Sequence, residues 1–466
     1  MGACLSHFFQ KGDDFETNSK CTSLLCKNSV KKHTNAAIAK LQIEYNLILM
    51  FNRIFQQTAV PNQYRTNFLH LYFDIAWFGV LSGSTVNFLN VYATRIGATG
   101  LQIGLIGAMS AVVILFLAIP AGIWLQKRNI GHAIFWTSVF YRIGFLSFAL
   151  LPWLFSNSVQ ISLIIAITFF MAIPLTPVGV GFNALFAEAV PSEYRAHVAG
   201  IRNVMFAVTY MFTSLLSGYI LDKVTFPVGY QIVFGIGFIG AMMSSFHLYH
   251  IRHIGGADAS PLSPPELDSA TQTDSPRNIY AILRLDILRT PFLTILLSLF
   301  AFHLAQNLPT PIFPIFNVRE LHLNDNQIGI GTALFYFTVL IGSTRLRKIV
   351  HRHGNKRVTG LGAMGMAFYP IILSFSTQVW HYYAVSLIGG FFTALATGSY
   401  ANYMLEHIPP DDRPTHLAWY NIVLNIAILT SSLAGPAIAD QIGLFNALIL
   451  FGIVRFLAGT IVLKWG

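Results

Sequence analysis

The decisive stretch of this chain is EAVPSEYR at residues 188–195, which returns as EHIPPDDR at residues 406–413. A second pair keeps a similar register, because LQIGLIGA at 101–108 resembles NQIGIGTA at 326–333. The two offsets are 218 and 225 residues, and each copy sits among long apolar runs. A repeat of this length inside an apolar chain predicts a membrane protein built from two similar halves.

The composition also indicates a membrane protein. Hydrophobic residues make up 54% of the chain and charged residues 10%, whereas soluble domains carry about 25% charged residues. A helix needs about 20 apolar residues to cross the bilayer. We therefore predict an all-α membrane protein with twelve transmembrane helices in two parallel six-helix repeats, at 68–92, 99–126, 132–152, 158–187, 196–221, 228–251, 291–317, 327–345, 358–376, 380–405, 415–439 and 442–463.

The basic residues predict how the chain is oriented. With the N-terminus inside, fourteen Lys and Arg residues fall in the inner loops between spans, and three fall in the outer loops, namely Arg95, Lys223 and Arg319. This asymmetry follows the positive-inside rule, so both termini are expected in the cytoplasm. The net charge of +10 is therefore assigned to orientation and anionic lipid, and no nucleic-acid partner is expected.

Six plus six parallel spans with inward termini and a long central loop resemble the major facilitator superfamily. The loop after the second span resembles that family's signature, GIWLQKRNIG at 122–131, with Gln126 where the family has an acidic residue. The second copy keeps Arg352, Gly354 and Lys356. The resemblance covers about residues 60–466 and implies transport between two halves that rock about a central site.

Four regions are expected along the chain. They are a cytoplasmic N-terminal segment (1–66) with a possible interfacial helix, an N-terminal bundle (67–252), a cytoplasmic linker rich in Pro and Ser (253–290), and a C-terminal bundle (291–466). The start of the chain matches a myristoylation pattern at Gly2 with Cys4 nearby, and the sequence leaves open whether either residue is lipidated. Neither a metal site nor a cofactor is expected, because no Cys/His cluster, phosphate loop or nucleophile motif occurs.

Charged residues inside the predicted spans are candidates for function, because they are costly in a bilayer. Asp74 in the first span is the candidate for proton coupling. The alternatives are a fixed ion pair with Arg142 in the third span, or a helix-end acid among the lipid headgroups. Arg142 and Arg455 are expected to be structural, because the resemblance implies that spans three and twelve lie outside the cavity.

A second group of charges is expected to form an inner gate. Glu188 and Arg195 recur as Glu406 and Arg413, and basic loops lie on the same side of the membrane. The resemblance implies that such charges pair between halves when the protein faces outward; the alternative is that they serve topology alone. The gate candidates are Lys127, Arg128, Glu188, Arg195, Arg202, Arg352, Glu406 and Arg413.

Polar residues within the spans are candidates for the substrate cavity. The seventh span carries three of them on one helical face, just before Pro309, Pro311 and Pro314. Prolines free backbone carbonyls, which is tolerated where a helix lines a cavity. The alternative for each is an interhelical hydrogen bond. The candidates are Asn87, Thr176, His303, Gln306, Asn307, Asn421 and Asn425.

These features predict a secondary active transporter of a small organic solute, which works by alternating access and is coupled to protons or another ion. It is expected to be a monomer in the plasma (inner) membrane. The alternatives are a facilitative uniporter and a non-transporting receptor or scaffold of the same fold. An integral-membrane enzyme is not expected, because no paired-His or His-x4-Asp cluster occurs at the inner face.

Overall fold

A computed structural model of the protein describes residues 62–251, 285–409 and 412–466. The N-terminal segment up to residue 61, with Gly2, Cys4 and the expected interfacial helix, lies outside the described residues. So does the Pro/Ser-rich part of the linker. Apart from short turns and caps, the described chain is helical, which confirms the all-α prediction.

The first half of the chain supplies six predicted spans, and one of them is interrupted. The first span consists of two α-helices joined by a short π-helix, η1. A π turn inside an α-helix is a local bulge that redirects the side chains beyond it. The elements are α2 (Asn62–Leu81), η1 (Ser82–Val86), α3 (Asn87–Arg95), α4 (Gly100–Gln126), α5 (Ile130–Leu154), α6 (Asn157–Ala189), α7 (Ser192–Lys223) and α8 (Val228–Tyr249).

The second half supplies the other six, two of which are interrupted, the seventh and the ninth. Ten segments of the described chain are long and apolar enough to cross a membrane; the interrupted first and ninth spans complete the expected twelve. The elements are the 3-10 turn η2 (Leu285–Arg289), α10 (Phe292–Asn307), α11 (Ile312–Ile315), the π-helix η3 (Phe316–Glu320), α12 (Asp325–His353), α13 (Asn355–Met366), α14 (Phe368–Ser374), α15 (Val379–Leu405), α16 (Arg413–Ile442) and α17 (Leu444–Trp465).

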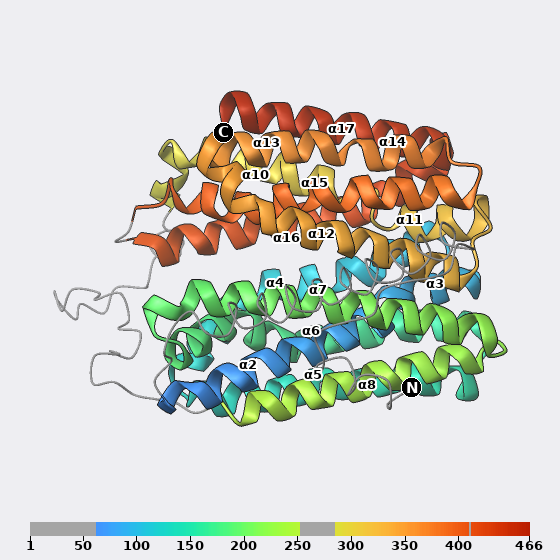
Figure 1. The fold of residues 1–466 in the computed structure, drawn as a ribbon, viewed down its shortest axis with the longest axis horizontal. Coiled ribbons are helices and arrows are strands. Elements are labelled where there is room, and N and C mark those ends of the chain that lie inside the picture. The colour runs from blue at the N-terminus through green and yellow to red at the C-terminus, as the bar shows by residue number, and fades with distance from the viewer. Residues whose placement is uncertain (1–61, 252–284, 410–411) are drawn as a thin grey trace, which may run out of the picture. The chain divides into compact units, whose positions relative to one another are not determined.

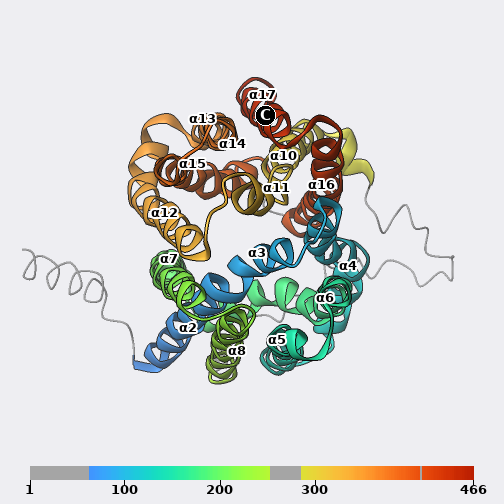
Figure 2. The same ribbon diagram turned by 90° about the vertical axis from the view of Figure 1, so that its right-hand side faces the viewer.

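Within residues 62–466 the helices form two bundles (Figure 1). In the first, α2 packs against α7 and α8, and α5 packs against α6 and α8. In the second, α13 packs against α15 and α17, and α10 packs against α16 and α17. The bundles meet where α7 lies beside α12 and where α4 lies beside α16 (Figure 2). These two seams are the principal contacts between the halves.

Large apolar side chains on the bundle surfaces are exposed, as expected for a protein that faces lipid. Phe116 and Trp153 are 76% and 73% exposed, and Phe170 is 66% exposed. An apolar surface of this kind is unfavourable in water but not in a bilayer. The protein is therefore a multi-pass integral membrane protein.

The repeated Gln-Ile-Gly motif has a structural explanation at both seams. Gln102 and Gln327 each close a capping box at the start of their helix, with Thr99 and Asn324 respectively. Two residues later, Gly104 abuts the backbone carbonyl of Ser432 on α16, and Gly329 abuts that of Ser214 on α7. A Cβ at Gly104 would lie 2.0 Å from the Ser432 oxygen. The repeat therefore encodes a helix start followed by a close approach of the two halves.

Prolines break two spans of the second half, and Arg455 satisfies the carbonyls that they leave free. Pro309 and Pro370 have no N–H, so the carbonyls four residues earlier, of Ala305 and Met366, lose their helical donor. Arg455 Nε donates to Ala305 O at 3.2 Å, and its Nη1 donates to Met366 O at 3.2 Å. Its Nη2 donates to Gln306 O at 2.7 Å. This arginine on α17 thus joins the broken α10 to the α13–α14 junction.

Candidate substrate and coupling site

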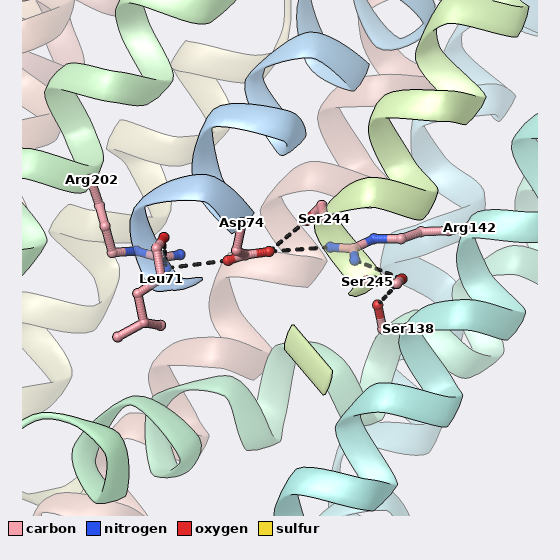
Figure 3. A network of polar contacts seen from close by, with 7 residues as sticks. All are labelled: Leu71, Asp74, Ser138, Arg142, Arg202, Ser244 and Ser245. Carbon is pink, nitrogen blue, oxygen red and sulfur yellow. Dashed lines mark hydrogen bonds and ion pairs between the residues drawn. The ribbon is translucent and has the colours of Figure 1, made fainter. Parts of the chain in front are cut away.

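Asp74 lies inside the first bundle and is 3% exposed. It is on α2, in the turns before the π-helix, and its carboxylate points between α7 and α8 (Figure 3). Ser244 Oγ on α8 donates to Asp74 Oδ1 at 2.5 Å. The carboxylate is therefore buried inside the bundle and held by groups that are far from it in sequence.

Two arginines approach this carboxylate from opposite sides (Figure 3). Arg202 Nη1 on α7 lies 3.2 Å from Oδ2, and Arg142 Nη2 on α5 lies 3.9 Å from Oδ1. Arg142 is 5% exposed and Arg202 is 8% exposed. Asp74 therefore has two guanidinium groups as counter-ions, one on each side of its carboxylate.

The two arginines differ in their other contacts. Arg142 Nη1 donates to Ser245 Oγ at 2.8 Å, and Ser245 Oγ lies 2.9 Å from Ser138 Oγ. Arg202 Nη1 also donates to the Leu71 carbonyl at 2.8 Å. Arg142 is thus held by hydroxyls deep between α5 and α8, whereas Arg202 is held on α2 and faces α6.

Arg202 also lies over aromatic rings of α6. Its guanidinium carbon is 4.9 Å from the centroid of Phe182 and 6.0 Å from that of Phe186. Such cation–π contacts stabilise a partly desolvated guanidinium. The sequence groups Arg202 with the inner gate, and in this structure its guanidinium pairs with Asp74; the gate role stays a prediction.

In the second half, His303 on α10 is the centre of a buried polar cluster. Its Nε2 lies 3.0 Å from the hydroxyl of Tyr420 on α16, and its ring meets that of Tyr400 on α15 edge-on with centroids 5.2 Å apart. His303 is 4% exposed. It therefore connects three helices of the second bundle, through one hydrogen bond and one aromatic contact.

Asn87 lies at the seam between α7 and α12. Its Nδ2 donates to Ser214 Oγ at 3.2 Å, and Ser214 Oγ donates to the Gly329 carbonyl of the other half at 3.2 Å. The Tyr210 hydroxyl donates to Asn87 Oδ1 at 3.4 Å, and the Tyr210 ring stacks on Tyr336 of α12 with centroids 3.9 Å apart. This candidate is thus part of a polar and aromatic contact between the halves.

The other cavity candidates mainly serve their own helices. Thr176 donates to Ala172 O at 2.8 Å, Asn307 to His303 O at 2.8 Å, and Asn425 to Asn421 O at 2.8 Å. Gln306 contributes its backbone carbonyl to Arg455. Asn421 is exposed. In this structure, these side chains do not form one polar cluster.

The gate candidates lie at the predicted cytoplasmic ends, and the hydrogen bonds found there are made within each half. Arg195 donates to the carbonyls of Val190 and Ala187, at 3.0 and 2.8 Å, and so caps the end of α6. Asn355 donates to Glu406 at 2.6 Å. Arg128 lies over the Trp124 ring at 4.7 Å. Lys127 and Arg352 are exposed, and the side chain of Arg413 lies outside the described residues.

A cavity of about 500 Å³ opens among the predicted cytoplasmic ends of α4, α5, α6 and α8. Its lining includes Arg128 and Glu188 of the gate set, together with Gln126 and His132. It lies wholly within the first half and contains none of the seven cavity candidates. We therefore do not assign it to the substrate.

A polar clasp that the sequence did not predict joins the halves at the opposite, predicted extracellular ends. Arg95 at the end of α3 pairs with Asp325 at 2.7 Å and donates to Leu323 O at 2.8 Å. Arg319 of the second half donates back to Ala98 O at 2.6 Å. Ala98 and Leu323 are 225 residues apart, which is the offset of the Gln-Ile-Gly motif. That offset is the signal that could have identified the clasp.

Comparisons with known proteins agree with this architecture. The family model of the Major Facilitator Superfamily matches residues 72–305 and again 295–466. A cis,cis-muconate transport protein from Acinetobacter baylyi is 24% identical over 303 residues, which cover 63% of this chain and 69% of the relative. Among solved structures, a mutant of the nucleoside transporter NupG has a TM-score of 0.64 at 13% identity, covering 86% of this chain and 99% of its own. A partially occluded, inward-open form of the E. coli xylose transporter XylE has a TM-score of 0.62 at 13% identity, covering 86% and 97%.

Proposed function

This chain belongs to the Major Facilitator Superfamily and is a membrane transporter of small solutes, not an enzyme; from that premise we propose that it moves a small organic solute by alternating access, driven by protons that bind Asp74. The observation that carries the proposal is the buried carboxylate between two arginines. A carboxylate whose counter-ions can rearrange is able to bind a proton in one state and release it in another. The expected location is the plasma membrane, with both termini in the cytoplasm.

Alternating access requires contacts that form at one end of the molecule and break at the other. The clasp of Arg95, Arg319 and Asp325 supports this, because it ties the halves at their predicted extracellular ends. Partly exposed ion pairs are individually weak, about 1 kcal/mol or less. A few of them together supply a bias that a solute and a proton can reverse. The repeated Glu188–Arg195 and Glu406–Arg413 segments would form the opposing gate in the other state.

Proteoliposomes test the transport and coupling proposals directly. The purified protein is reconstituted and offered cis,cis-muconate, uridine and xylose, with and without an inward proton gradient. For the solute that enters, Asp74→Asn is expected to abolish accumulation but to keep exchange, because exchange needs only the rocking motion. Asn keeps the shape of the side chain and removes its charge.

The outcomes separate the alternatives. Accumulation that is unchanged in a well-folded Asp74→Asn protein would rule out proton coupling at this residue. Uptake that never exceeds equilibrium in the wild type would favour a facilitative uniporter. A folded protein that carries no solute of a broad metabolite panel would favour a receptor or scaffold.

The two ends of the molecule are tested by cysteine accessibility. Arg95→Gln removes the clasp and should raise labelling from the outer side, whereas Arg195→Ala or Arg413→Ala removes the inner gate and should raise labelling from the inner side. Labelling that is unchanged in both inner variants would reduce those arginines to topology signals.

A further inference from the structure

The Asp74 cluster contains more positive than negative charge. Arg142 and Arg202 both face the single carboxylate of Asp74, so the three side chains together carry a charge of +1. The groups around the carboxylate come from every element packed on it: Arg142 on α5, Arg202 on α7, Ser244 on α8, and the His70–His247 pair on α2 and α8. An unbalanced charge in the membrane interior is costly unless another group compensates it.

The hydrogen bonds among the described residues show which arginine has capacity to spare. Arg142 Nη1 binds Ser245, its Nη2 faces Asp74, and its Nε is buried without a partner in that part of the chain. The hydrogen bonds of Arg202, by contrast, all leave from Nη1, to Leu71 O and Asp74. A guanidinium presents its N–H groups as a fork that suits a carboxylate. The Nε–Nη2 edge of Arg202 is therefore available to a second anion.

Aromatic rings lie against this guanidinium and farther along α7. Phe182 and Phe186 of α6 lie under the guanidinium. One turn beyond Arg202 on α7, Phe206 stacks on Phe78, with centroids 6.0 Å apart, and meets Tyr336 of the other half at 6.2 Å. Planar π systems pack favourably against such rings. The surroundings of Arg202 therefore combine a guanidinium edge that makes no hydrogen bond among the described residues with aromatic side chains that continue along α7 toward the opposite half.

Resting on the proposed transport function, we propose that Arg202 binds the carboxylate of the transported solute and that the substrate class is a small organic acid with a planar, unsaturated body. The solute carboxylate and Asp74 share Arg202, while Arg142 stays on the Ser138–Ser245 pair. When a proton neutralises Asp74, the arriving carboxylate takes its place as the counter-ion of Arg202. A carboxylate that enters alone lowers the charge of the cluster, including the solute, from +1 to zero, whereas a carboxylate that enters with a proton on Asp74 leaves that charge at +1. One proton per carboxylate therefore keeps the charge of the cluster constant through the cycle.

Binding measurements on the full-length detergent-purified protein test this without any need for flux. Three acids are compared with their neutral amides by thermal unfolding: benzoate with benzamide, sorbate with sorbamide, and succinate with succinamide. Benzoate or sorbate is expected to raise the unfolding midpoint by about 2 °C or more, because a ligand that binds the folded state stabilises it. The amides are expected to have no effect, and succinate a smaller one, since it lacks the unsaturated body.

Variants assign the effect to one residue. Arg202→Gln should weaken the apparent affinity for benzoate on the order of 30-fold or more. Arg65→Gln, an exposed arginine of α2 in the same half, removes the same charge and should leave the affinity unchanged. Arg202→Lys keeps the charge but loses the fork, and it provides a folded comparison if the Gln variant does not assemble.

Three results would overturn the proposal. The first is an amide that stabilises the wild type as well as its acid. The second is a set of acids without any effect. The third is an Arg202→Gln or Arg202→Lys protein with undiminished preference for the acid. None of them touches the proton-coupled mechanism, which the proteoliposome experiment tests by itself.

Discussion

The two halves have the same architecture but bury different chemistry. The first half encloses an ionic cluster, in which Asp74 meets Arg142 and Arg202. The second half encloses one arginine, Arg455, whose partners are backbone carbonyls that prolines leave free. His303, another buried titratable group of this half, is bonded to a tyrosine. The repeat therefore maintains helix starts and close contacts at the seams, while the interior of each bundle has diverged.

The difference indicates a division of labour. A carboxylate with two competing counter-ions can exchange them, which is what the proposed ion coupling and the proposed anion binding require of the first half. An arginine bonded to three carbonyls has no competing anion, and it holds a broken helix in place. Variants in the first half should therefore disturb an ion-paired cluster, and variants in the second half should disturb the packing of a broken helix.

Asp74→Ala is expected to be the most damaging change. It leaves two buried guanidinium groups without a carboxylate, at a cost of about 3–5 kcal/mol. Thermal unfolding in detergent should show a large fall in stability, and adding Arg142→Met should recover much of it. A single variant as stable as the wild type would show that the cluster is not an ion-paired unit.

Arg455→Met should cost about 3 kcal/mol, because buried carbonyls lose their donors. Pro309→Ala and Pro370→Ala return N–H groups to the Ala305 and Met366 carbonyls, so they should rescue Arg455→Met while giving the wild type no comparable gain. Equal effects of the prolines in both backgrounds would refute the assignment of Arg455 to the proline breaks.

The two seams between the halves should be destabilised alike by substitutions at their glycines, because the repeated Gln-Ile-Gly motif forms a close contact at each seam. Gly104→Ala and Gly329→Ala each place a Cβ against a backbone carbonyl, at 2.0 and 2.7 Å. Overpacking of this kind costs about 1–3 kcal/mol. Gly107→Ala is the matched control, because its Cβ would lie 3.4 Å from the Ser432 hydroxyl. If Gly104→Ala and Gly329→Ala were as stable as Gly107→Ala, the close contact at the seams would not contribute to stability.

Tyr420→Phe should have the smallest effect. It removes one neutral hydrogen bond to His303, worth about 1 kcal/mol. The loss of stability should not depend on a proton gradient across proteoliposomes. The number of protons moved per solute should stay at the wild-type value. A changed ratio of protons to solute would indicate that His303 or Tyr420, in the second half, takes part in proton coupling.

The sequence identified several site residues as unusual for a membrane span, but it did not show which residues they contact. An acid in an apolar run is rare, so the sequence points to Asp74, with Arg142 as a possible partner, but it does not indicate that Arg202 meets Asp74. The reason is that the buried face of α7 cannot be read from its weak periodicity in a chain that is apolar on all sides. The clasp of Arg95 and Asp325 escaped notice because loop charges are read first as topology signals.

The sequence by itself determined the helical class, the spans, the duplication and the family, because each of these depends on local hydropathy or on a repeat visible along the chain. Only the tertiary structure decided which groups meet. Asp74 finds Arg202 across 128 residues and Ser244 across 170, and Arg455 reaches Ala305 across 150. Such pairings depend on how helices rotate and pack, and the bilayer, which favours apolar surface on every outward face, leaves little trace of that rotation in the sequence.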